Sequence, residues 1–173
     1  MRRFLFVAAL LAALSFPAAV SADTTGGQFT EPPPANSTGG MTVSVGRVTL
    51  TARLVVAADV MVTCQPKPPN EYPISSYWED YRLTFSVKQA SGRSIAFGQA
   101  AVQFDPNAIC DGLPHVLSAS VSADPAGVAF KNGSAVVAVD GLANYSFYDS
   151  ETGESGYHRS GASTGWTSVR LGR

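Results

Sequence analysis

Residues 48–64 read VTLTARLVVAADVMVTC, and every even-numbered position in this stretch is apolar. Polar or charged residues, such as Thr49, Arg53 and Asp59, occupy several of the odd positions. Successive side chains of a β-strand point to opposite faces, so this alternation predicts strand structure with one buried face. Strands usually contain about 3–10 residues, and we therefore expect two strands that divide near Ala57, or else one bent strand.

The same two-residue period recurs in shorter runs, bounded by Gly, Pro, Ser and Asp. These runs cover residues 83–88, 95–104 with an interruption at Gly98, 117–122 and, less regularly, 135–139. A closing strand is expected at 166–171. Asp140-Gly141 is expected to end the strand that begins near Ala135. No later stretch has a capped helical period, so almost no helix is expected. About seven short strands at this spacing are typical of an antiparallel β-sandwich or a small barrel.

The N-terminal residues have the pattern of an export signal. Arg2 and Arg3 precede an apolar stretch at 4–16, and small residues follow at 20–22. The apolar stretch is too short to cross a bilayer core of about 30 Å as a helix. We therefore predict a signal peptide over 1–22, cleaved near Ala22-Asp23, and a secreted protein with no later membrane span.

The rest of the chain divides into a spacer and one domain. Residues 23–40 (DTTGGQFTEPPPANSTGG) contain too few large apolar side chains to fold alone, and we expect a disordered spacer. Residues 41–173 have the length of a single domain. Within it, residues 149–165 are rich in Gly and Ser and lack an apolar period, so a long loop is expected there.

Composition limits the classes of function. Charged residues make up 14% of the chain, and 12 Lys and Arg are matched by 13 Asp and Glu without a basic cluster. Nucleic-acid binding is therefore not expected. Two His and two Cys predict no multi-ligand metal site and no cofactor. A partner is more readily met through hydrogen bonds and aromatic contacts than through charge.

The two cysteines, Cys64 and Cys110, are expected to form one disulfide in an exported chain. If consecutive strands run antiparallel, the end of the second strand and the start of the fifth lie at the same end of the domain. The two residues are too far apart in sequence for a redox-active Cys-x-x-Cys motif, which makes that alternative a poor fit.

Four stretches resemble a group of secreted actinobacterial immunoglobulin-like domains of unknown function. They are VMVTC at 60–64, LTFSVKQ at 83–89, CDGLPH at 110–115 and FKNGSA at 130–135. The resemblance covers roughly residues 45–140 and implies an immunoglobulin-like antiparallel β-sandwich of about seven strands with one disulfide. It implies no enzymatic activity.

The sequence does not predict a catalytic or metal site. His115 and His158 are the only histidines, and no Gly-x-Ser-x-Gly elbow accompanies them. Asp105 and Asp111 flank Cys110 and offer oxygen ligands for calcium, but Asp beside Pro, Asn or Gly is also typical of turns. We therefore expect no enzyme and no bound metal.

Aromatic residues before the strand at 83–88 form the candidate binding surface: Tyr72, Tyr77 and Trp78. Tyrosine and tryptophan on a proline-stiffened loop can stack on sugars or anchor a protein. Strict alternation places Tyr77 and Tyr81 on the core side and Trp78 on the opposite side, so we expect Tyr81 buried, Trp78 more exposed and Tyr72 exposed. The aromatic residues at 145–148, 157 and 166 are expected to cover the end strand.

Together these observations predict a secreted, non-catalytic binding module that acts as a monomer. Its ligand is expected to be an extracellular protein or a cell-wall glycan, bound through loops at the disulfide end. Two alternatives are a carrier of small apolar ligands with the immunoglobulin-like fold and an extracellular hydrolase. An apolar cleft would favour the carrier, and an aromatic surface would favour the binding module.

Overall fold

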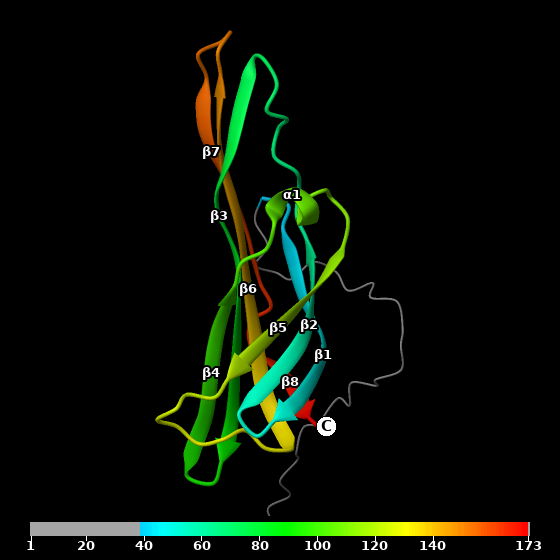
Figure 1. The fold of residues 1–173 in the computed structure, drawn as a ribbon, viewed down its shortest axis with the longest axis vertical. Helices are drawn as coiled ribbons and strands as arrows, with labels where there is room; N and C mark the ends of the chain where they lie inside the picture. The colour runs from blue at the N-terminus through cyan, green and yellow to red at the C-terminus, as the bar shows by residue number, and fades with distance from the viewer. Residues whose placement is uncertain (1–38, 173) are drawn as a thin grey trace, which may run out of the picture. The chain divides into compact units, whose positions relative to one another are not determined.

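The structure, a computed structural model, describes residues 39–172 (Figure 1). The expected signal peptide at 1–22 lies outside the described residues, as does the expected spacer up to residue 38. Gly39 and Gly40 form a turn that leads into the first strand. No helix in the described part of the chain is long and apolar enough to cross a membrane.

Eight strands and one helical turn make up residues 39–172. They are β1 (Thr42–Ala52), β2 (Val55–Thr63), β3 (Ile74–Ser91), β4 (Ser94–Val102), α1 (Pro106–Ile109), β5 (His115–Ser122), β6 (Gly133–Asp149), β7 (Ser155–Ser163) and β8 (Thr167–Leu171). The expectation of an all-β protein with almost no helix is confirmed. The strand count is eight where the sequence indicated about seven.

The strands form two antiparallel sheets. The smaller sheet has the order β1-β2-β5, and the larger has the order β4-β3-β6-β7. Strand β8 also pairs with β6, along residues 133–137, whereas β7 pairs along residues 140–148. These two short strands therefore follow one another along the same edge of β6.

One hydrophobic core draws on both sheets. Fully buried side chains include Val56 and Val60 from the smaller sheet and Leu83, Phe85 and Val137 from the larger one. Burial of apolar surface is the main favourable term in folding, so this shared cluster is what holds the two sheets together.

The division between β1 and β2 lies at Arg53-Leu54, not near Ala57 as the alternation suggested. Leu50 pairs with Val56, and the register shifts at a bulge between Leu50 and Ala52. Even-numbered residues therefore face the same side before and after the turn. The apolar alternation runs through the hairpin without a break, which is why it does not reveal the turn.

Strand β6 continues through Asp140-Gly141, where the sequence predicted an end. Gly141 is buried, and a Cβ atom there would lie 2.5 Å from Met41 Cε and 2.8 Å from Val43 Cγ1. The glycine leaves room for the side chains of Met41 and Val43 against the backbone of β6, and it does not form a turn.

The long loop expected at 149–165 is also wrong, because β7 occupies most of this range and pairs with β6. The side of β7 that faces inward carries Gly156, His158, Ser160 and Ala162. These are small or polar side chains, so the strand has no apolar period to detect. Its backbone hydrogen bonds to β6 fix it as a strand.

Strands β3, β6 and β7 continue beyond the point where β4 ends, past α1 (Figure 1). We call the part formed by residues 74–82, 142–149 and 155–161 the three-stranded extension. It leaves the rest of the fold at the end where β2 finishes, and it carries most of the aromatic residues singled out in the sequence.

Candidate functional site

The disulfide between Cys64 and Cys110 is confirmed, with a Cα–Cα distance of 4.6 Å. Cys64 follows β2 and Cys110 ends α1, and both are buried. The Gly112 N–H donates to the Cys64 carbonyl at 3.0 Å, which fastens the same two segments a second time. A buried structural disulfide is typical of proteins that fold in oxidising compartments.

The proline-rich segment at 64–73 connects this disulfide to the extension. Lys67 Nζ donates to Ser76 Oγ at 3.0 Å, and the Ser76 hydroxyl donates to the Pro68 carbonyl. The Ser150 N–H donates to the Pro73 carbonyl at 3.0 Å. The segment is thus held to the inner side of the extension, and Tyr72 remains 83% exposed.

A β-bulge in β3 decides which aromatic side chains are accessible. The pairing with β6 shifts between Trp78 and Asp80, which leaves Glu79 as an extra residue. An extra residue reverses the alternation, so Tyr77 and Trp78 exchange the faces that strict alternation assigns to them. Tyr77 is 60% exposed, whereas Trp78 is half-buried against the core.

The expectations for Tyr77 and Trp78 are therefore wrong, and the bulge is the reason. Tyr81, which follows the bulge, is half-buried and packs against the core, with its ring edge toward Phe104 at 6.1 Å between centroids. Tyr72 is exposed, as the sequence suggested.

The inner face of the extension is an aromatic row from three strands. The Trp78 ring meets Tyr145 edge-on at 5.6 Å between centroids, and Tyr145 stacks on His158 at 4.8 Å. Trp78 Nε1 donates to Asn107 Oδ1 at 3.1 Å, which ties the row to α1. These contacts occupy Trp78 within the fold, so it is a structural residue and not part of an open surface.

The outer face of the extension presents three exposed tyrosines. In the strand register, Tyr77 and Tyr157 lie on either side of Ser146, and Tyr148 is two residues further along β6 on the same face. Tyr148 and Tyr157 are 49% and 50% exposed. Adjacent strands are about 4.8 Å apart, so the outer two tyrosines are anchored about 10 Å apart. We call Tyr77, Tyr148 and Tyr157 the tyrosine face.

Two charged side chains lie beside the tyrosine face. The Ser146 hydroxyl donates to Glu79 Oε1 at 2.6 Å, which places a carboxylate beside the tyrosine face. The guanidinium of Arg159 lies over the Tyr157 ring, 5.7 Å from its centroid. The face therefore combines flat aromatic surface with a hydrogen-bond acceptor and a cationic donor.

Sequence reasoning found Tyr77 but did not assign Tyr148 and Tyr157 to the binding surface. These residues come together only through the register of three strands that are far apart in the chain. Their positions in the sequence carry one usable signal, because Tyr148 and Tyr157 flank the turn that contains Gly153. Recognising that signal requires knowing that residues 155–163 form a strand.

The acidic residues near Cys110 are used in local turns. Asp105 Oδ1 accepts from the Asn107 N–H at the start of α1. Asp111 Oδ1 is 2.9 Å from His115 Nε2 and accepts from the Leu113 N–H at 2.8 Å. These hydrogen bonds, chiefly the one from His115, lower the pKa of Asp111. Among residues 39–172, no three His, Cys, Asp or Glu side chains are grouped so as to hold a metal ion.

One serine and one histidine do lie within hydrogen-bond distance of each other. His158 Nε2 is 3.1 Å from Ser160 Oγ, but Ser160 is buried and its hydroxyl donates to the Gly39 carbonyl at 2.7 Å. This pair holds the turn at Gly39 in place, and the buried hydroxyl is not presented to a substrate.

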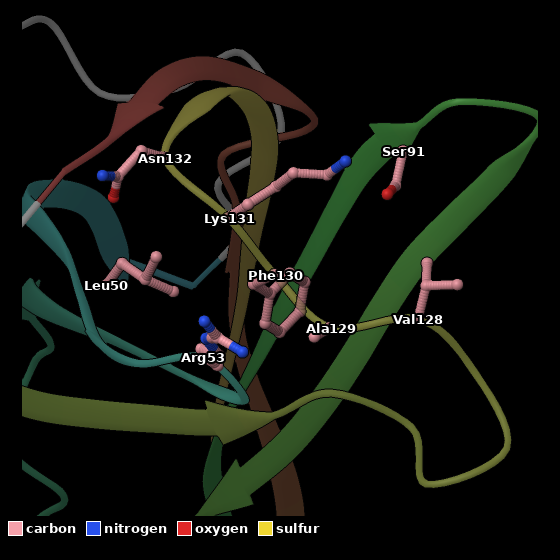
Figure 2. Close-up of a pocket in the computed structure, with 8 residues that line it drawn as sticks. All are labelled: Leu50, Arg53, Ser91, Val128, Ala129, Phe130, Lys131 and Asn132. Carbon is pink, nitrogen blue, oxygen red and sulfur yellow. The ribbon is translucent and has the colours of Figure 1, made fainter.

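An open depression lies at the other end of β2, between the β1–β2 turn and the segment at 128–132 (Figure 2). Its apolar lining includes Leu50 and Phe130, which are only 4% and 1% exposed. The side chains of Arg53 and Lys131 also line it. The depression therefore offers little apolar surface to a ligand, and it does not favour the carrier of apolar molecules.

Comparison of the chain with protein-family models, with curated proteins and with solved structures finds no match.

Proposed function

We propose that this protein is a secreted, non-catalytic binding module that attaches to an extracellular glycan through the tyrosine face. The observation that carries the proposal is the presence of three tyrosines, each about half exposed, on one face of the three-stranded extension. Isolated exposed aromatic residues are ordinary, but a group on one face is typical of a binding surface.

The chemistry of this face suits a sugar polymer. Tyrosine rings offer flat apolar surface on which sugar rings can stack, and each phenol hydroxyl can exchange hydrogen bonds with sugar hydroxyls. Glu79 and Arg159 add an acceptor and a donor at the margin of the same face. The strands fix the backbone of each tyrosine, so little conformational freedom is lost on binding.

We further propose that the fold is an immunoglobulin-like β-sandwich. Two antiparallel sheets share one core, and β2 and β5 are neighbours in one sheet. The bridge between Cys64 and Cys110, together with the apolar N-terminal sequence after Arg2-Arg3, supports export.

Retention of the protein on insoluble polysaccharides and purified cell walls tests the proposal. A variant with Tyr77→Ala, Tyr148→Ala and Tyr157→Ala is compared with the unmodified protein. Each exposed aromatic anchor contributes roughly 1–2 kcal/mol, so the triple variant is expected to bind at least about tenfold more weakly. Trp166→Ala is the matched control, because Trp166 is equally exposed but lies outside the tyrosine face.

Equal retention of the triple variant and the unmodified protein would contradict the proposal. If no glycan retains the protein, while the same three substitutions abolish capture of one secreted protein, the partner is a protein and the glycan assignment is wrong. Unchanged melting temperatures for all variants ensure that a loss of binding is not a loss of fold.

A further inference from the structure

The depression at the β1–β2 turn has a charge pattern that the proposed function does not use. It has a volume of about 470 Å³, a size typical of small-ligand pockets, which span about 300–1,000 Å³. Figure 2 shows Arg53 and Lys131 on either side of the Phe130 ring, with the Lys131 side chain extended toward Ser91. Two cationic side chains thus stand around a floor of buried apolar residues.

Neither cation has an acidic partner among residues 39–172. The ion pairs in the described part of the chain are Arg82 with Asp80 and His115 with Asp111, so Arg53 and Lys131 have no acidic partner there. Asp124 is the acidic residue of the loop that leads to Lys131. It is not part of the lining, and its Oδ1 accepts from the Ala126 N–H at 2.9 Å.

The backbone that carries Lys131 is held firmly by a buried side chain. Gln89 Nε2 donates to the Lys131 carbonyl at 2.7 Å, and Gln89 Oε1 accepts from the Lys131 N–H at 2.8 Å. Gln89 is itself buried within β3. A two-way amide contact of this kind fixes the backbone from which the Lys131 side chain projects at the rim of the depression.

Neutral hydrogen-bonding groups complete the lining. Ser91 at the end of β3 offers a hydroxyl, and Asn132 offers a carboxamide. Arginine with a second cation and neutral donors is the usual set of groups that binds a carboxylate or phosphate.

We infer that this depression binds an oxyanion, either the carboxylate or the phosphate group of a ligand, with Arg53 and Lys131 as its charged contacts. The site is independent of the tyrosine face. It lies at the start of β2, whereas the disulfide and the extension lie at its end, about 30 Å away along the strand.

Backbone amide shifts of the secreted protein, recorded by NMR during titration with inorganic phosphate and separately with acetate, test the inference. Sodium chloride at matched ionic strength is the reference, because screening alone also moves shifts. The amides of residues 53, 91 and 128–132 are expected to shift and to saturate with a Kd of about 1–10 mM, which is typical of a single small anion. A tighter Kd for phosphate or for acetate shows which ligand chemistry the site takes.

The double variant Arg53→Gln/Lys131→Gln is expected to bind the preferred anion at least about tenfold more weakly, since it removes both charge-assisted contacts. Arg47→Gln is the matched control, because Arg47 is an exposed cation on β1, the strand that leads to Arg53, but lies outside the depression. Shifts that do not saturate, or that are the same in chloride or in the double variant, would overturn the inference. Whether a glycan binds to the tyrosine face does not affect the outcome of the anion titration, because the two sites are separate.

Discussion

The bridge between Cys64 and Cys110 joins residues 46 positions apart, and this separation sets its effect on stability. The unfolded chain loses conformational freedom when such a loop is closed, which stabilises the native state by roughly 4 kcal/mol in the chain-entropy model. We expect the variant Cys64→Ser/Cys110→Ser to melt on the order of 10–20 °C below the unmodified protein.

Calorimetry with and without a reducing agent provides the measurement and its control. Reduction is expected to lower the melting temperature of the unmodified protein by a similar amount and to leave the variant unchanged. A variant that melts within a degree or two of the unmodified protein would show that the bridge contributes little.

The carboxyl group of Asp111, which lies in a turn, makes the stability of the protein depend on pH in the acidic range. Hydrogen bonds from His115 and from the Leu113 N–H lower the pKa of this carboxyl in the folded state. An acid with a lowered folded pKa stabilises the protein above its unfolded pKa, and this contribution is lost as the pH falls through the folded value. Stability should therefore decrease below a pH of about 4.

Melting temperatures measured between pH values of about 6 and 2 test this linkage. Asp111→Asn is expected to reduce the loss of stability on acidification, because the substituted residue no longer titrates. Asp149, whose pKa is lowered by the N–H groups of Glu151 and Thr152, contributes in the same direction. An acid response of Asp111→Asn identical to that of the unmodified protein would contradict the assignment.

At the scale of the strands, a glycine inside a strand permits close packing, whereas a glycine in a turn permits an unusual backbone conformation. Gly98 interrupts an apolar run in β4, and the backbone carbonyl of Ser122 in β5 lies where its Cβ atom would be. The absence of a side chain at Gly98 lets the backbones of β4 and β5, which belong to different sheets, lie in contact here.

Gly98→Ala is accordingly expected to destabilise the protein by about 1–3 kcal/mol, the usual range for overpacking, because a backbone carbonyl cannot move aside as a side chain can. Urea denaturation measures the change in the free energy of unfolding. Gly172→Ala is the matched control, since no atom lies within 4 Å of a Cβ atom built there. Equal stability of the two variants would mean that β4 and β5 can separate without cost.

The bulge at Glu79 is the element that assigns the aromatic side chains of β3 to their faces. Without the extra residue, Trp78 would lie on the outer face of the extension and Tyr77 would lie on its inner face. One extra residue moves every earlier side chain of the strand to the opposite face. Apolar alternation identified β3 correctly from residue 83 onward, but the positions before the bulge were assigned to the wrong side.

At the scale of the whole molecule, the core and the extension differ in how they are held. Strands β2, β3 and β6 contribute fully buried apolar residues to the shared core, whereas β7, whose strand partner among residues 39–172 is β6, buries mainly small or polar side chains. Segments with few buried apolar contacts open locally at a lower free energy than the core.

Amide hydrogen exchange should separate these two parts. We expect the amides of β7 to exchange at least about tenfold faster than those of Val136 and Val137 in β6, because these two residues pair with β3 on one side and with β8 on the other. Strand β2, which lies between β1 and β5, serves as the reference for global unfolding. Equal protection of β7 and β2 would show that the extension unfolds together with the core.

The sequence by itself determined the all-β class, the disulfide pairing and most strand positions. Each of these follows from local periodicity, or from there being only two cysteines to pair. The tertiary structure decided what depends on contacts between distant segments. Those contacts make Gly141 part of a strand, give β7 its backbone partners and bring Tyr77, Tyr148 and Tyr157 onto one face. The physical reason is that strand register and bulges are fixed by pairing across the sheet. The sequence of one strand does not show which residues of another strand pair with it.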